Sequence, residues 1–332
     1  MAEALSARGV TVSFAGPIRT DPRLITGAGF ELDVFRVEGI PREPSLRAAA
    51  AVTHAIAAPF ACLRILRRRR PDVVLGAGGY AGGPMVIAAA MLRIPAAITE
   101  ADAHLGLANR LVAPFAQRVL LAFPLEERKG KYRVVGRPLP SRSLAPAGGT
   151  AEARRRFGLP VEGPVVLVCG GSQGAQRLND AALEAFGGEG PAVLHLAGER
   201  DFARLGPRVT RSDYRLLAFT DDFGSALAAA DLVVSRSGGT VWEIAAAGKP
   251  ALLIPYPYAT ADHQTKNARH FVDAGGAVAV PESMLDLRGQ ADELLGDPDR
   301  LAAMGEAMRA AARPDAAEIV AEELLTLAAT HR

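Results

Sequence analysis

The chain has 332 residues, of which 49% are hydrophobic and 22% are charged, with a formal net charge of +2. This composition is typical of globular proteins and excludes disordered and fibrous classes, while the length allows two α/β domains. A net charge this small gives no sign of general nucleic-acid binding, so no nucleic-acid partner is expected. Cys62 and Cys169 lack metal-ligand spacing and fit a reducing compartment.

Short β-branched runs alternate with alanine-rich segments along the chain, a pattern typical of β-α units on a parallel sheet. In the first half, strands are predicted at residues 10–15, 30–37, 72–75, 96–99, 119–122 and 132–135. In the second half, strands are predicted at residues 165–169, 192–196, 215–218, 232–235, 251–255 and 277–280. We expect each set to form one sheet, and helix after Glu282. No apolar run approaches the roughly 20 residues that a membrane span needs.

Residues 136–164 separate the two sets and contain a stretch rich in proline and glycine, followed by a short helical pattern. We place the domain boundary near Pro138, giving domains 1–138 and 139–332, with the last helix returning toward the first domain. The first nine residues read as the second half of a helix that leads into a strand. In a doubly wound sheet the first strand is central. We therefore expect two strands to lack a ladder partner, and upstream sequence to encode the strand between them.

The run VVLVCGGSQGAQRLND, residues 165–180, is a strand followed by glycines and a helix start. Its spacing differs from the dinucleotide fingerprint G-x-G-x-x-G, and the G-K-[ST] ending of a P-loop is absent. Glycines allow close backbone approach, Ser172 offers a hydroxyl, and a helix start attracts anions, so a diphosphate is the expected ligand. The alternative is a tight turn without a ligand.

A second glycine-rich helix start lies in the same half, within SRSGGTVWE at residues 235–243. Glu243 there offers a carboxylate to a ribose diol, or simply favours the N-terminus of its helix. Polar residues crowd YATADHQTKNARHF at residues 258–271, which reads as a ligand-binding loop or as a solvated helix cap.

Two motifs of the first half also follow predicted strands. LGAGGYAGGP at residues 75–84 precedes an apolar helix, and its glycines serve either a ligand or close packing. ITEADAHLGLANRL at residues 98–111 places Glu100, Asp102, His104 and Asn109 after the next strand. These groups belong at the carboxyl end of the sheet, where an interdomain cleft would lie.

Six motifs in order resemble the MurG family of glycosyltransferases: GAGGYAGGP, EADAHLGLANR, VVGRPLP, CGGSQGAQRLN, SRSGGTVWEIAAAGKPALLIPYP and DHQTKNA. The resemblance implies a GT-B architecture, two Rossmann-like doubly wound parallel-sheet domains facing an interdomain cleft. It implies inverting transfer of N-acetylglucosamine from UDP-N-acetylglucosamine to undecaprenyl-diphosphate-linked muramyl pentapeptide (lipid I to lipid II) in peptidoglycan synthesis. No cofactor or metal is implied. The implied location is the cytoplasmic face of the cell membrane, as a peripheral protein.

The resemblance also assigns roles to residues. On the donor side, Gly171 and Ser172 would contact the phosphates or sugar, Glu243 the ribose, Gln264 the sugar and Thr220 the uracil. Gly238, Gly239 and Thr240 would lie near the diphosphate. On the acceptor side, Gly78, Gly79 and Tyr80 would line the acceptor diphosphate site, with Asn109 nearby and Asp102 as candidate general base.

The sequence departs from the family pattern at three places. The family's first loop, G-G-T-x-G-H, has no counterpart in the sequence, and neither has the histidine that this loop carries. The family's G-N-P-V-R reads GRPLP at residues 136–140, so that Arg137 or Arg142 would supply the phosphate contact. The glycine segment before Trp242 is one residue shorter than in many members.

Residues 46–70 predict the membrane contact that a lipid acceptor requires. Val52, Ile56, Phe60 and Leu63 share a helical face, with Arg64 and Arg67 to Arg70 beyond, as in a patch against an anionic membrane surface. The alternative is a helix that packs this face on the sheet. Two other functions stay open: another UDP-sugar-dependent GT-B enzyme, and a nucleotide-sugar-binding protein without catalysis.

Overall fold

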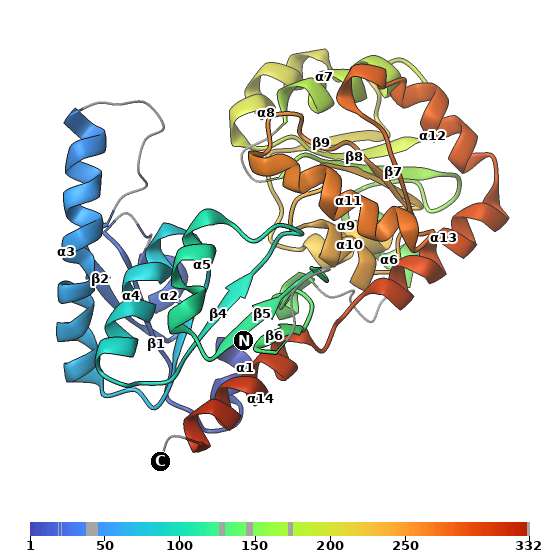
Figure 1. The fold of residues 1–332 in the computed structure, drawn as a ribbon. Coiled ribbons are helices and arrows are strands. Elements are labelled where there is room, and N and C mark those ends of the chain that lie inside the picture. The colour runs from blue at the N-terminus through green and yellow to red at the C-terminus, as the bar shows by residue number, and fades with distance from the viewer. Residues whose placement is uncertain are drawn as a thin grey trace. The chain divides into compact units, whose positions relative to one another are not determined.

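The computed structural model describes residues 1–18, 20, 22–37, 46–125, 130–143, 149–171 and 175–330. The chain forms two compact units (Figure 1). The first comprises Met1–Pro138 together with Asp315–Arg332, and the second comprises Leu139–Pro314. None of the described helices is both long enough and apolar enough to cross a membrane.

The second unit is built on one six-stranded parallel sheet in the order β12-β11-β10-β7-β8-β9. Its strands are β7 (Val165–Cys169), β8 (Ala192–Leu196), β9 (Tyr214–Leu217), β10 (Leu232–Ser235), β11 (Ala251–Leu253) and β12 (Ala277–Ala279). This is the doubly wound order: β8 and β9 are added on one side of β7, and β10 to β12 are added on the other, so the strand order reverses between β7 and β10. Every residue of β7, β8 and β10 is buried, because helices cover both faces of the sheet (Figure 1).

Helices connect these strands and bury apolar faces against them. They are α6 (Gly149–Arg156), α7 (Gln176–Phe186), α8 (Glu199–Leu205), α9 (Phe223–Ala229), α10 (Val241–Ala246), α11 (His263–Asp273), α12 (Leu287–Leu295) and α13 (Pro298–Ala311). In α7, Leu178, Ala182 and Phe186 recur every four residues and join the core of the sheet. The loops of this unit also contain two short 3₁₀ turns, η2 (Ser141–Ser143) and η5 (Glu282–Met284).

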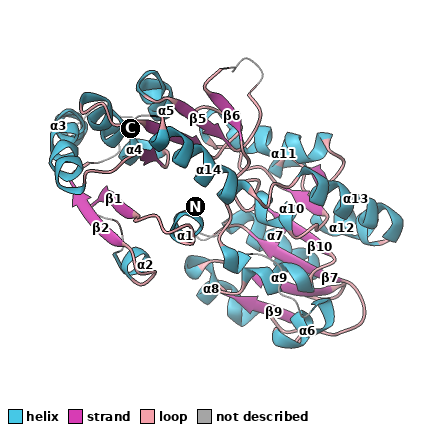
Figure 2. Cartoon of the chain, turned by 90° about the horizontal axis from the view of Figure 1, so that it is seen from below, coloured by secondary structure: helices cyan, strands magenta, loops and turns pink. Residues whose placement is uncertain are grey.

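The first unit contains two parallel sheets rather than the single sheet expected from its set of strands. β1 (Ser13–Pro17) pairs with β2 (Glu31–Phe35). β3 (Val74–Gly76), β4 (Ala96–Glu100), β5 (Arg118–Leu121) and β6 (Tyr132–Val134) form the second sheet in that order. Figure 2 shows the β1–β2 pair apart from β5 and β6. Within the described ranges, β1 and β3 therefore each have a ladder partner on one side.

Helices of the first unit are α1 (Ala2–Ser6), α2 (Pro22–Thr26), α3 (Leu46–Arg69), α4 (Gly79–Met91), α5 (Leu107–Val112) and α14 (Ala316–Ala329). α14 joins this unit although it lies at the far end of the sequence. Its Val320, Leu324 and Leu327 share an apolar cluster with Met1 and Leu5. Arg8 Nη2 also lies 2.6 Å from Glu318 Oε2, an ion pair between the two ends of the described chain.

Candidate functional site

Two glycine-rich loops of the second unit follow the adjacent strands β7 and β10. Because the strand order reverses between these two strands, the loops at their carboxyl ends flank the position where α/β sheets bind ligands. Gly170 lies where a Cβ atom would be 2.4 Å from Ala175 Cβ, and Gly171 has a φ of +92°, so both positions require glycine. Ser172, the predicted phosphate contact, lies outside the described residues, as do residues 173 and 174.

The SRSGG loop after β10 is anchored by α11. Asn267 is fully buried and its Nδ2 donates to Ser237 O at 3.1 Å. A Cβ atom at Gly238 would lie 3.8 Å from Gln264 Nε2, and Gln264 Oε1 accepts from Tyr256 N at 2.9 Å. The structure thus brings Gly238 together with Gln264, two of the residues predicted for the donor site. Gly239 follows in the same loop.

Glu243 lies in the first turn of α10, after Thr240 at the helix N-cap. Its Oε1 accepts a short hydrogen bond from the Ser143 hydroxyl of η2. Burial raises the pKa of the Cys169 thiol to about 12, the hydrogen bond between Cys169 Sγ and the Ser235 hydroxyl oxygen opposes this shift, and the charge of Glu243 adds to it. The Glu243 carboxylate therefore lies at the start of the helix that follows β10, with its Oε1 bound to η2.

Arg236 and Glu282 form a buried ion pair at the same edge of the sheet, which the sequence did not reveal. Arg236 Nη1 donates to Ile254 O at 3.1 Å, and its Nη2 donates to Glu282 Oε2. Arg177, in the first turn of α7, donates to Glu282 Oε1 at 2.9 Å. Burial raises the pKa of Glu282, but the hydrogen bonds from Arg236 and Arg177 outweigh it and lower the pKa below its usual value. The sequence signal for this ion pair was the position of Arg236, directly after the predicted strand 232–235.

Thr220, the predicted uracil contact, follows β9 at the edge of the sheet. Its hydroxyl oxygen accepts from Asp222 N at 3.1 Å, and Asp222 in turn caps α9 by accepting from Ser225 N. Thr220 shares the carboxyl edge with the glycine loops, but β8 separates its strand from β7.

In the first unit, Glu100 organises the loop that follows β4. Glu100 is 9% exposed, and its carboxylate accepts from Ala101 N at 2.9 Å and Gly106 N at 2.9 Å. Asn109 Nδ2 donates to Glu100 Oε2 and to Thr99 O, both at 2.9 Å. Asp102 N also donates to Glu100, at 3.3 Å. Asn109 is thus buried within the network that shapes the loop carrying Asp102.

Gly78 and Gly79 join β3 to α4, and both have positive φ angles of +86° and +66°. A Cβ atom at Gly78 would lie 3.4 Å from Thr99 O and 3.9 Å from Asn109 Nδ2, so the loop after β3 adjoins the one after β4. Tyr80 follows in the first turn of α4 and is 48% exposed. Arg137 is half-buried in the segment after β6, and the Arg142 side chain lies outside the described part.

The prediction that Leu63 belongs to an exposed apolar face of α3 together with Phe60 is wrong. Leu63 is only 7% exposed and belongs to the core, while Phe60 is 63% exposed. The two positions differ by about 60° around the helix, which places Leu63 at the border of the buried face. The side chains of Val52 and Ile56 lie outside the described part of the chain.

The arginines near the end of α3 also fall into two groups, one paired with carboxylates of β2 and one exposed to solvent. Arg69 Nε lies 2.8 Å from Asp33 Oδ2, and Arg69 also pairs with Glu31. Arg68 pairs with Asp33 as well. Arg64 and Arg67 are exposed on the side of Phe60. Part of the run therefore ties α3 to β2, and part lies beside an exposed aromatic ring.

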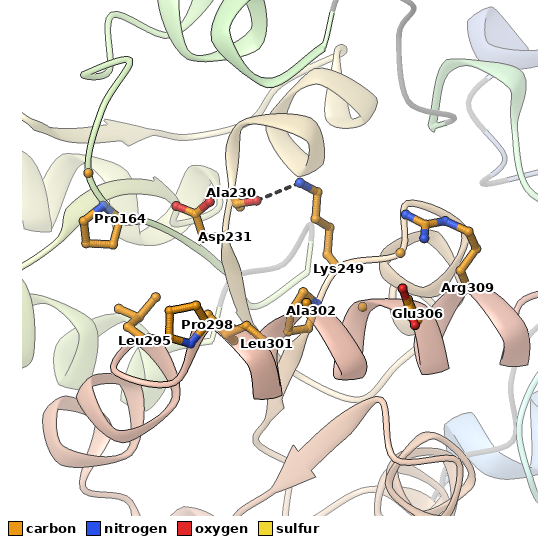
Figure 3. A pocket seen from close by; sticks show the side chains of 14 residues that line it. Pro164, Ala230, Asp231, Lys249, Leu295, Pro298, Leu301, Ala302, Glu306 and Arg309 are labelled. Carbon is orange, nitrogen blue, oxygen red and sulfur yellow. Dashed lines mark hydrogen bonds between the residues drawn. The ribbon is translucent and has the colours of Figure 1, made fainter.

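A cavity of about 590 Å³ lies at the opposite edge of the sheet of the second unit (Figure 3). Pro164, Asp231 and Pro250 line it, and each precedes a strand. Lys249 Nζ donates to Ala230 O at 2.8 Å and to Ala228 O at 3.2 Å, as a cation at the C-terminus of α9. This cavity is therefore separate from the glycine loops, which follow the strands.

Comparison with known proteins agrees with this geometry. Residues 1–121 match the glycosyltransferase family 28 N-terminal domain, and residues 165–320 match its C-terminal domain. The chain is 42% identical over 333 residues to the UDP-N-acetylglucosamine–N-acetylmuramyl-(pentapeptide) pyrophosphoryl-undecaprenol N-acetylglucosamine transferase of Rubrobacter xylanophilus, covering 98% of each chain. The identically named protein of Halorhodospira halophila is 40% identical, covering 97% of this chain and 91% of its own.

Solved structures show the same architecture. The crystal structure of Acinetobacter baumannii MurG matches with a TM-score of 0.76 and 27% identity, covering 98% of this chain and 93% of that one. The calicheamicin glycosyltransferase CalG4 matches in fold, with a TM-score of 0.67 and 18% identity over 98% of this chain and 94% of that one. The predicted α/β fold of GT-B type is confirmed. The chain belongs to the MurG family of glycosyltransferases, within glycosyltransferase family 28.

Proposed function

We propose that this chain transfers N-acetylglucosamine from UDP-N-acetylglucosamine to undecaprenyl-diphosphate-linked muramyl pentapeptide, with inversion at the anomeric carbon. One observation carries the proposal: the glycine loops after β7 and β10 flank the point at which the strand order of the second unit's sheet reverses, and Glu243 lies in the first turn of the helix after the second loop. The names of the relatives supply the substrates. The unit Leu139–Pro314 would bind the donor, and Met1–Pro138 the acceptor.

On the donor side, the helix starts after the two loops would face the diphosphate. Backbone N–H groups at the start of α7 and α10 favour the negative charge that grows on UDP as it leaves. Each hydrogen bond to a charged group contributes about 1.5 to 3 kcal/mol. Gly171, Ser172 and Gly238 to Thr240 would supply these contacts, with Gln264 on the sugar, Glu243 on the ribose and Thr220 near the uracil.

On the acceptor side, the loop held by Glu100 would present the catalytic group. Asp102 would accept the proton of the muramyl C4 hydroxyl as that oxygen attacks the anomeric carbon. Gly78, Gly79 and Tyr80, at the adjoining loop, would line the acceptor diphosphate site. Arg137 would add a phosphate contact.

The acceptor is a membrane lipid, which implies contact with a bilayer. Phe60, with Arg64 and Arg67 on the same exposed side of α3, would insert beside anionic headgroups. We accordingly propose a peripheral protein at the cytoplasmic face of the cell membrane.

The test is transfer of labelled N-acetylglucosamine from the UDP donor to a lipid I analogue by the full chain. Formation of a labelled disaccharide lipid with inverted configuration is the expected result. Asp102→Asn should lower kcat, and Glu243→Ala should mainly raise the KM for the donor. Binding of UDP without any transfer under these conditions would reject the enzymatic function in favour of binding alone.

A further inference from the structure

Ser143 contacts a predicted donor-site residue from a segment to which the sequence assigned no role. It ends η2, soon after the second unit begins at Leu139. Its backbone N donates to Pro140 O at 2.9 Å, and the turn packs against α9. The hydroxyl donates to Glu243 Oε1, a hundred residues away in sequence. The segment after Pro138 thus reaches the carboxylate proposed to bind ribose.

The hydrogen bond from Ser143 to Glu243 is part of the folded structure, because the Ser143 side chain is buried. Ser143 is 3% exposed, so a hydroxyl turned away from Glu243 would lose its partner without gaining water. A carboxylate accepts about four hydrogen bonds. Among the described residues, the Ser143 hydroxyl is the side-chain donor to Glu243, and it takes Oε1, which leaves Oε2 as the oxygen that we assign to a ligand.

We propose that Ser143 is a positioning residue for the donor: it fixes the Glu243 carboxylate by Oε1, so that Oε2 accepts from a ribose hydroxyl. The inference rests on the proposed function, because it assigns the diol of a ribonucleoside diphosphate to Glu243. A glutamate held in one rotamer loses less freedom on binding than a mobile one, and therefore binds the hydroxyl more tightly. Ser143 acts through Glu243 and does not itself touch the donor.

Calorimetric binding to the full chain tests this, with UDP, 2′-deoxy-UDP and 3′-deoxy-UDP as probes. The wild type should bind at least one deoxy analogue about tenfold more weakly than UDP. In Ser143→Ala, the Kd for UDP should rise about tenfold, and the preference over the same analogue should fall to about twofold. Ser141→Ala, in the same turn but exposed, is the matched control and should keep the wild-type preference.

The ratio of the two Kd values separates positioning from a merely structural role. Loss of packing would weaken UDP and its deoxy analogues alike and leave the ratio unchanged. In a Glu243→Ala background, Ser143→Ala should have no further effect on the ratio. Ser143→Thr, which keeps the hydroxyl, should restore the preference, and it provides a second readout if Ser143→Ala folds poorly.

The outcomes also separate this inference from the function on which it rests. A wild type that discriminates against a deoxy analogue, with an unchanged ratio in Ser143→Ala, overturns the role of Ser143 and leaves the function standing. A wild type that binds UDP without discrimination overturns the ribose role of Glu243, and the role of Ser143 with it. A wild type that does not bind UDP overturns both proposals.

Discussion

The Tyr214 hydroxyl oxygen lies 2.8 Å from His195 Nδ1, in a site where neither side chain reaches solvent. His195 Nε2 lies 3.0 Å from Asn179 Oδ1. Asn179 Nδ2 already donates to Ala197 O and to Asp201, so Oδ1 must accept from Nε2–H, and Nδ1 accepts from tyrosine. Every polar atom of a neutral imidazole is satisfied in this chain of hydrogen bonds.

Because the site holds a neutral imidazole, we predict an acid-sensitive fold. Burial lowers the pKa of His195 to about 4, against a smaller opposing effect of Asp201. The unfolded chain binds the proton near pH 6.5 and the folded chain only near pH 4, so stability is full above pH 6.5 and falls as the pH drops between these values. The loss should approach about 3 kcal/mol by pH 4.

Urea denaturation at pH 7.5, 6.0 and 5.0 measures this loss, and His195→Gln is the control that removes the titrating group. The wild type should lose more free energy of unfolding than His195→Gln between pH 7.5 and 5.0. Equal losses in the two proteins would show that other groups control the acid sensitivity.

Arg154 provides a second prediction, on stability alone. Its side chain is 6% exposed, its Nη2 lies 2.6 Å from Asp231 Oδ2, and its other donors reach Ala229 O, Val161 O and Gly163 O. Arg154→Ala should cost about 3 kcal/mol, because it removes the donor to three backbone carbonyl oxygens and the cationic partner of Asp231, whose carboxylate keeps the hydrogen bond from Val165 N. Arg155→Ala, at the exposed neighbouring position, should change the free energy of unfolding by less than about 0.5 kcal/mol.

The strands could be predicted from the sequence because strands of a buried parallel sheet are short runs of apolar, mostly β-branched residues. All twelve predicted strands occur within the described residues, and the ranges of β7, β8 and β10 are the predicted ones. β1 was predicted from residue 10 but begins at Ser13, because Val10 N donates to Leu5 O and still belongs to the turn after α1. The six strands of the first unit divide into two sheets, and β1 and β3 each pair on one side only, which agrees with the expectation that two strands lack a ladder partner rather than with a single sheet.

Candidate site residues could be chosen from the sequence where a motif follows a strand, but not where side chains converge from separate loops. The motifs pointed to Glu243, Gln264 and Gly238, and the structure places each of them at the carboxyl edge of the sheet. Ser143 and Glu282 come from segments that carry no motif. Their roles depend on which side chains meet after folding, as α3 also shows by turning Leu63 into the core.

The network around Glu100 gives a third prediction. Asn109→Ala removes the Nδ2 donor to Glu100 and Thr99 and leaves a carboxylate at a site with little solvent. We expect a cost of about 2 to 3 kcal/mol and faster hydrogen exchange at the amides of Ala101 and Gly106, which Glu100 holds. The exposed neighbour Arg110→Ala should leave both measurements unchanged, and unaltered exchange in Asn109→Ala would show that the backbone alone shapes the loop.

Removal of Arg177 and removal of Glu282 should differ sharply in their cost to stability, because Glu282 also pairs with the buried Arg236. Arg177 has a side chain 75% exposed, so Arg177→Ala should cost less than about 1 kcal/mol. Glu282→Ala strands Arg236, whose side chain is 9% exposed, and should cost about 3 to 5 kcal/mol in denaturant unfolding. The lowered pKa of Glu282 means that its contribution is present above the unfolded pKa and is lost as the pH falls through the folded one. Similar costs for the two variants would contradict the burial of the Arg236 pair.

The last prediction concerns the proposed membrane contact through α3. Phe60→Ser should weaken binding to vesicles that contain anionic lipid by about tenfold, because burial of an aromatic ring in the bilayer interface is lost. Arg64→Ala should weaken it about fivefold, since each basic residue near an anionic surface contributes about 1 kcal/mol, and this effect should fade in high salt. The matched control is Phe202→Ser in the second unit, where the ring is 40% exposed. Sedimentation with vesicles measures all three, and equal losses for Phe60→Ser and Phe202→Ser would show that α3 is not the membrane-binding surface.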